Sequence, residues 1–72
     1  MVSLYDSDAG SYRIAWLVGR RGRLLQEQYG FAVDDSVEVV RSYGIDGTVV
    51  RVAGRDIALD GKTAYAVKLV AC

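Results

Sequence analysis

The sequence contains no proline and no histidine, and its one cysteine, Cys72, stands at the last position. Without histidine the commonest general base is missing, and Cys72 has no imidazole to activate it as a nucleophile. A single cysteine also forms no intramolecular disulfide, which is typical of a reducing compartment. We therefore expect a cytoplasmic protein that does not carry out acyl-transfer catalysis of the usual kinds.

An excess of charge of either sign is lacking as well, because nine Lys and Arg residues balance nine Asp and Glu residues. No global field then recruits nucleic acid or acidic lipid. The first ten residues have no basic region and no long apolar run, so we expect no signal peptide. No segment approaches the roughly 20 apolar residues that span a membrane, and we expect no direct membrane insertion.

What is present is a globular composition, with 51% apolar residues in 72. A chain of this length forms one domain with one small core, which we assign to residues 1–72. Alternation of apolar and polar residues, broken by glycine turns, predicts five strands. They are Ser11–Val18, Val37–Arg41, Thr48–Val52, Asp56–Leu59 and Ala66–Ala71. Residues 60–64 are interpreted as a turn or a single turn of 3₁₀ helix.

One short helix is predicted between the first and second strands, at Arg23–Tyr29, after a GRRG loop at residues 19–22. Leu25 and Tyr29 lie four residues apart and share a helical face, so this side is expected to pack on the sheet. Gly30 suits the left-handed position that follows a helix, and Phe31 can close back on Leu25. The predicted fold is therefore mainly β, a small, partly open five-stranded barrel with one helix that covers an open side.

The order of residues in the second half of the chain is more specific. VRVAGRDIALDGKTAYAVKLV, from Val50 to Val70, resembles the closing half of FeoA domains. The matching positions are Val50, Val52, Gly54, Ile57, Ala58, Leu59, Ala64, Ala66 and Val70. Upstream, the R-L-L element at residues 23–25, the G-F pair at 30–31 and the V-E-V-V strand at 37–40 are also similar to that family. The resemblance implies an SH3-like barrel.

It also implies a small cytosolic accessory of bacterial ferrous iron uptake that is not an enzyme. Such a protein acts with the FeoB-type ferrous iron transporter through the transporter's cytoplasmic GTPase region. A second interpretation is a stand-alone SH3-like regulatory module of the kind attached to metal-dependent repressors. The initiating methionine and the complete barrel pattern favour a free-standing protein.

A third interpretation is a small barrel that binds nucleic acid, with the GRRGR arginines contacting phosphates while Tyr12 and Trp16 stack on bases. So few arginines in a neutral chain neutralise few phosphates, and we therefore do not expect this binding. GRRGR also lacks the spacing of a phosphate-binding loop, and no cofactor is expected. The pairs Asp6–Asp8 and Asp34–Asp35 suit a hard cation only weakly, so no metal site is expected.

A protein-binding surface is expected where apolar residues are poorly explained as core. Leu25 and Phe31 are expected inside the barrel, whereas Leu24 and Tyr29 are placed near its rim. Trp16 can be interior or an exposed anchor, depending on strand register. Our hypothesis is one face built from the helix and the Ser42–Gly47 loop. Its residues are Leu24, Tyr29, Tyr43 and Ile45, with a polar rim of Arg20, Arg21 and Arg23.

Overall fold

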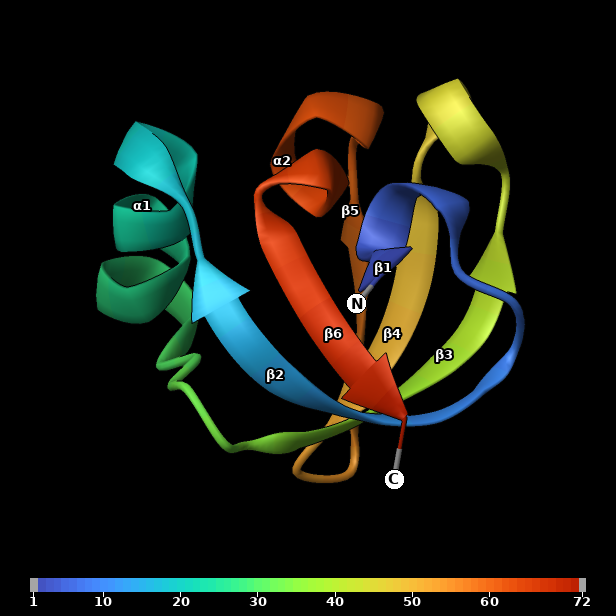
Figure 1. Ribbon diagram of the computed structural model, residues 1–72, viewed down its shortest axis with the longest axis horizontal. Coiled ribbons are helices and arrows are strands. Elements are labelled where there is room, and N and C mark those ends of the chain that lie inside the picture. The colour runs from blue at the N-terminus through green and yellow to red at the C-terminus, as the bar shows by residue number, and fades with distance from the viewer. Residues whose placement is uncertain (1, 72) are drawn as a thin grey trace.

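The computed structural model describes residues 2–71, and the strands in this part of the chain form one antiparallel sheet. Its strands follow the order β1-β6-β2-β3-β4-β5 (Figure 1). The strands are β1 (Val2–Ser3), β2 (Gly10–Leu17), β3 (Ser36–Ser42), β4 (Thr48–Val52), β5 (Arg55–Leu59) and β6 (Val67–Ala71). The helices are α1 (Gly19–Tyr29) and α2 (Gly61–Tyr65), with 3₁₀ turns η1 (Leu4–Asp6) and η2 (Gly44–Asp46). The prediction of a mainly β fold is confirmed.

The strand count differs from the prediction, because the sheet has six strands rather than five. The additional strand, β1, pairs with β6 through Val2 opposite Leu69 and Ser3 opposite Lys68. Two residues are too few to show a period of two, so no sequence pattern marked them. Since β1 and β5 stand at the two ends of the strand order, the sheet curls without closing into a full barrel.

The N-terminal residues help to fill the curled sheet. Leu4 is fully buried, and its carbonyl oxygen accepts a hydrogen bond from the Thr48 hydroxyl at 3.0 Å. The Ser42 hydroxyl likewise donates to the Tyr5 carbonyl at 3.2 Å. These bonds tie η1 to β3 and β4, while β1 ties the same segment to β6. The core around Leu4 consists of Ile14, Leu25, Phe31, Val37, Val39, Val50, Leu59, Ala64, Val67 and Leu69.

Helix α1 begins four residues earlier than predicted, because the GRRG segment is its first turn and not a loop. Gly22 is buried, and a Cβ there would lie 2.6 Å from the backbone carbonyl carbon of Leu17. The glycine therefore serves close packing of the helix on β2. At the other end Gly30 has φ 72°, which confirms the predicted left-handed ending. The Leu25 carbonyl accepts hydrogen bonds from both Gly30 and Phe31.

Residues 61–65 form the α-helix α2, where the sequence indicated only a turn. Asp60 caps this helix, since its Oδ1 accepts a hydrogen bond from the Thr63 backbone N–H at 2.8 Å. Ala64 is fully buried, so α2 is anchored in the core despite its length. In Figure 1, α2 stands between α1 and the turn η2 at the same end of the molecule.

Candidate functional site

The seven residues predicted to bind a partner are all exposed, and they come from two separate parts of the chain. Arg20, Arg21, Arg23, Leu24 and Tyr29 lie on α1, whereas Tyr43 and Ile45 lie in the connection from β3 to β4. Helix α2 separates the two groups (Figure 1). The hypothesis of a joint face between α1 and the Ser42–Gly47 loop stays a prediction, and such a face would also have to include α2.

Two neighbouring grooves flank α1, and Arg21 and Leu24 line both of them. The α1–β5 groove has a volume of about 350 Å³ and lies between the helix and the end of β5. It is lined by Arg21, Leu24, Leu25, Gln28, Tyr29, Ala58, Leu59, Asp60 and Thr63. The α1–α2 groove has a volume of about 510 Å³ and is lined by Val18, Arg20, Arg21, Leu24, Lys62, Tyr65 and Ala66.

The two adjacent leucines of α1 differ in burial. Leu25 is 1% exposed and belongs to the core, whereas Leu24 is 41% exposed and lines both grooves. A helix of this length buries only one narrow stripe, so the adjacent leucine is left at the rim. Tyr29 lines the α1–β5 groove and stacks at a tilt on Phe31, with 6.1 Å between ring centres.

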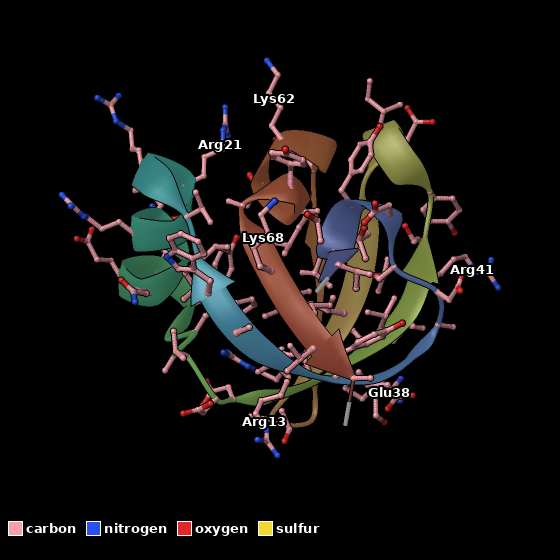
Figure 2. The ribbon with its side chains drawn as sticks, in the orientation of Figure 1. Arg13, Arg21, Glu38, Arg41, Lys62 and Lys68 are labelled. Carbon is pink, nitrogen blue, oxygen red and sulfur yellow. The ribbon has the colours of Figure 1, made fainter. Side chains whose placement is uncertain are left out.

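The α1–α2 groove combines apolar walls with cations. Arg20, Arg21 and Lys62 line it, and its lining includes no carboxylate. Arg21 makes one weak hydrogen bond, from Nη1 to the Thr63 hydroxyl at 3.4 Å. Figure 2 shows Arg21 and Lys62 projecting side by side from the end of the molecule, far from Arg13. Arg23, the third predicted arginine, is exposed on α1 but lines neither groove.

Tyr65 is a groove residue that the sequence analysis missed. It is 61% exposed, yet its ring is held from two sides. The Lys68 ammonium lies 3.6 Å from the ring centre, a cation–π contact, and the Tyr5 ring meets it edge-on with 6.1 Å between centres. Lys68 is itself fixed, because Nζ donates to the Ser3 hydroxyl and to the Tyr65 carbonyl, both at 2.7 Å. An exposed aromatic ring with a fixed orientation loses little freedom when a partner binds.

Asp60 stands at the edge of this region, where α2 begins. Hydrogen bonds from the Thr63 side chain and backbone lower the pKa of Asp60, and the charges of Arg21 and Lys62 lower it further. The carboxylate is therefore occupied as a helix cap. It lines the α1–β5 groove and is absent from the lining of the α1–α2 groove.

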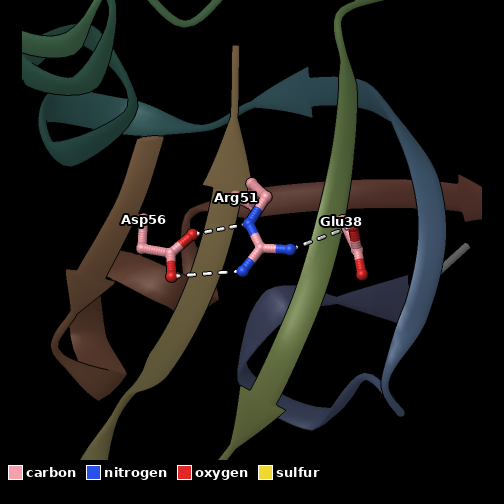
Figure 3. A network of polar contacts seen from close by, with 3 residues as sticks. All are labelled: Glu38, Arg51 and Asp56. Atoms are coloured by element: carbon pink, nitrogen blue, oxygen red, sulfur yellow. Dashed lines mark hydrogen bonds and ion pairs between the residues drawn. The ribbon is translucent and has the colours of Figure 1, made fainter. Parts of the chain in front are cut away.

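Ion pairs lie elsewhere on the surface. Arg51 on β4 bonds Asp56 on β5 at 2.7 Å and lies 3.8 Å from Glu38 on β3 (Figure 3). The hydrogen bond with Arg51 lowers the pKa of Asp56, and the same bond raises the pKa of Arg51. Within residues 2–71 these are the ion pairs of the protein, and none involves Arg20, Arg21 or Lys62.

The register of β2 decides the position of the tryptophan. Trp16 pairs with Lys68 next to an irregularity in the ladder and is 59% exposed, so it is not barrel interior. Tyr12, the other aromatic of the nucleic-acid interpretation, lines a separate groove with Asp6 and Asp8. The structure therefore does not bring Tyr12 together with the GRRGR arginines.

In each pair of carboxylates considered for metal binding, one carboxylate accepts a backbone hydrogen bond. Asp6 Oδ1 accepts the Ser3 N–H at 3.2 Å, and Asp35 Oδ2 accepts the Ala32 N–H at 3.0 Å. No set of three or more His, Cys, Asp or Glu side chains in residues 2–71 is placed to hold a metal ion. In the same part of the chain, no helix is long and apolar enough to cross a membrane. Cys72 lies outside the described residues.

No protein-family model matches the sequence, and no curated protein matches it. Solved structures do match. The FeoA-like protein from Clostridium acetobutylicum superposes with a TM-score of 0.78 at 11% identity, over 97% of this chain and 85% of that one. A crystal structure of the iron uptake regulatory protein FeoA gives 0.75 at 18% identity, over 96% of both chains.

The chain has a FeoA-like fold.

The predicted SH3-like architecture agrees with the match to these FeoA structures, although the sheet of this protein has six strands rather than the predicted five. The same fold also occurs inside larger proteins. The manganese regulator SloR matches with a TM-score of 0.85 at 11% identity over 99% of this chain. The chain spans 34% of SloR and 35% of ScaR, a protein solved with bound Cd²⁺. Because the sequence identities to these structures are only 11% to 18%, the matches show that the fold is FeoA-like and nothing beyond the fold.

Proposed function

We propose that the protein is a small accessory of ferrous iron uptake that binds the cytoplasmic GTPase region of a FeoB-type transporter. The surface that binds it is the pair of grooves on either side of α1. The observation that carries this proposal is the α1–α2 groove, where exposed Leu24 and Tyr65 lie beside cations that have no ion-pair partner in residues 2–71. The order of the FeoA-like sequence elements and the FeoA-like fold support the choice of partner.

Exposed apolar side chains next to unpaired cations are typical of a protein-binding patch. Aromatic residues and arginine are enriched at such interfaces, and few residues in them carry most of the binding free energy. Tyr65 has the fixed orientation of an interface anchor, and Leu24 faces two grooves at once. We therefore expect both residues to lose most of their exposed area in the complex.

A second candidate function is a regulatory module that works with a metal-dependent regulator. The observation that favours it is the match to SloR, whose TM-score of 0.85 exceeds the 0.78 and 0.75 of the two FeoA structures. In this case the chain would contact the part of such a regulator that lies outside the matching third. Binding of the protein to the transporter region and to a regulator fragment can be measured in parallel.

The test is an NMR titration of the ¹⁵N-labelled protein with the soluble cytoplasmic region of a FeoB-type transporter, with and without guanine nucleotide. We expect amide shifts centred on α1 and α2. The double variant Leu24→Ser/Tyr65→Ser should weaken them, while the matched variant Val33→Ser, at another exposed apolar position, should not. Absence of shifts at high concentration, or shifts confined to the β3–β5 side, would contradict the proposal. Shifts produced only by the regulator fragment would support the second candidate.

A further inference from the structure

The charge around the α1–α2 groove is one-sided although the whole chain is neutral. The formal net charge is zero, yet Arg20, Arg21 and Lys62 line this groove without any carboxylate. The carboxylates that form ion pairs in residues 2–71 pair with Arg51, on another side of the sheet (Figure 3). The excess positive charge of the groove therefore has no counter-charge built into its lining.

The position of the arginines costs stability. Arg20 and Arg21 lie in the first turn of α1, and this turn contains no acidic residue. The N-terminal end of a helix carries partial positive charge, so cations there are unfavourable and carboxylates are favourable. A sequence that breaks a local rule of this kind typically does so at a functional site.

The apolar part of the groove is shaped to receive a side chain. Val18, Leu24 and Tyr65 are all partly exposed around a volume of about 510 Å³, which lies within the size range of ligand pockets. Tyr65 is held by Lys68 and Tyr5, so one wall is formed before binding. The opening is flanked by Arg20 and Arg21 from α1 and by Lys62 from α2.

We infer that the α1–α2 groove binds an acidic segment of a protein partner, whose carboxylates meet Arg20, Arg21 and Lys62 while one of its apolar side chains enters between Leu24 and Tyr65. Charge complementarity selects the acidic partner. The apolar walls favour a peptide over a nucleic acid, because a nucleic-acid site relies on phosphate neutralisation and this chain has no net positive charge. The inference deepens the proposed function and rests on it for the identity of the partner.

The experiment measures binding of fluorescent peptides to the intact protein by anisotropy at low and high salt. The probe is a peptide of about twelve residues, rich in glutamate, with leucines spaced to share one helical face. We expect binding that weakens with added salt. The variant Arg20→Gln/Lys62→Gln should weaken it roughly tenfold, because exposed ion pairs each make a modest contribution. The variant Leu24→Ser should also weaken it.

Matched controls separate charge placement from total charge. Arg13→Gln removes one positive charge at a distant site (Figure 2) and should leave peptide affinity unchanged. The same peptide with lysine for glutamate, or with serine for leucine, should not bind. Equal loss in Arg13→Gln, or equal binding of the lysine peptide, would overturn the inference. So would tighter binding of a single-stranded oligonucleotide or of phosphatidylglycerol vesicles than of the acidic peptide.

A competition arm keeps this inference distinct from the proposed function. If the cytoplasmic region of a FeoB-type transporter displaces the acidic peptide, both are supported. If the peptide binds as described but the transporter region does not bind, the inference stands and the proposed function fails. If the transporter region binds and Arg20→Gln/Lys62→Gln leaves its affinity and salt dependence unchanged, the inference fails and the proposed function stands.

Discussion

Replacing Gly61 with alanine tests the contact that holds α2 against the turn η2. A Cβ at Gly61 would collide with the carbonyl oxygen of Ile45 and lie 2.8 Å from its carbonyl carbon and 3.0 Å from its Cα. All three are backbone atoms, so no rotamer change relieves the collision. Overpacking of this kind costs about 1–3 kcal/mol.

Helix propensity opposes this cost. Alanine in a helix is favoured over glycine by about 0.5–1 kcal/mol, so without the collision Gly61→Ala would stabilise the protein. With the collision we expect a net loss of about 1–2 kcal/mol. For a domain of this size that lowers Tm by about 4–16 °C. The total stability expected for the chain is about 4–11 kcal/mol, so the variant still folds and can be measured.

The assay is reversible thermal and urea unfolding followed by circular dichroism. Ile45→Ala is the matched control, because the Ile45 side chain is 76% exposed and its removal should change stability by less than about 0.5 kcal/mol. The two substitutions should be additive, since the colliding atoms belong to the backbone. A Gly61→Ala variant as stable as the natural protein, or rescue of its stability by Ile45→Ala, would refute the close approach of α2 to η2.

Two further predictions concern the ends of the helices. Gly30→Val should lower the free energy of unfolding by at least ~1 kcal/mol, because φ at Gly30 is 72° and a β-branched residue is strained there; unchanged urea unfolding would contradict this. Asp60→Ala should be less stable than the natural protein near neutral pH, because the α2 cap is lost. The pKa of Asp60 is lowered on folding, so this difference should persist above the unfolded-state pKa of about 3.9 and disappear as pH falls through the folded-state pKa. A difference in Tm that stays constant to acidic pH would show that the charge of Asp60 is not involved.

Local patterns were sufficient for much of the sheet. Thr48–Val52 was predicted as a strand with the bounds that β4 has, because alternation and flanking glycines mark it clearly. The ending of α1 at Gly30 was also predicted from a local pattern, because a glycine after a short amphipathic segment indicates the left-handed residue that ends a helix. Leu25 and Phe31 were expected in the core and are buried.

The remaining elements depend on contacts between distant residues. The two residues of β1 form a strand because β6 lies beside them, and Leu4 is buried because β3 and β4 bond η1. Gly22 indicated a loop by composition, although it is needed for the approach of α1 to Leu17. Local propensity contains none of this information, and tertiary contacts override it.

The candidate site also contains residues that local patterns identified and residues that only tertiary contacts bring into place. Arg20, Arg21 and Leu24 were recognised because they are close neighbours in the sequence, although the two arginines were expected in a loop and lie in the first turn of α1. Lys62 and Tyr65, which complete the α1–α2 groove, come from a helix too short to show a period. The only local signal for α2 was Asp60 three residues before Thr63, the spacing of a helix cap.

The open sheet has a consequence for solubility. Free strand edges can pair with other chains and lead to aggregation. In this protein one edge strand, β1, is only two residues long, and the other, β5, begins with the charged residues Arg55 and Asp56. Short or charged edges discourage such pairing. Both edges of the open sheet therefore have features that oppose pairing with the edge strands of other chains.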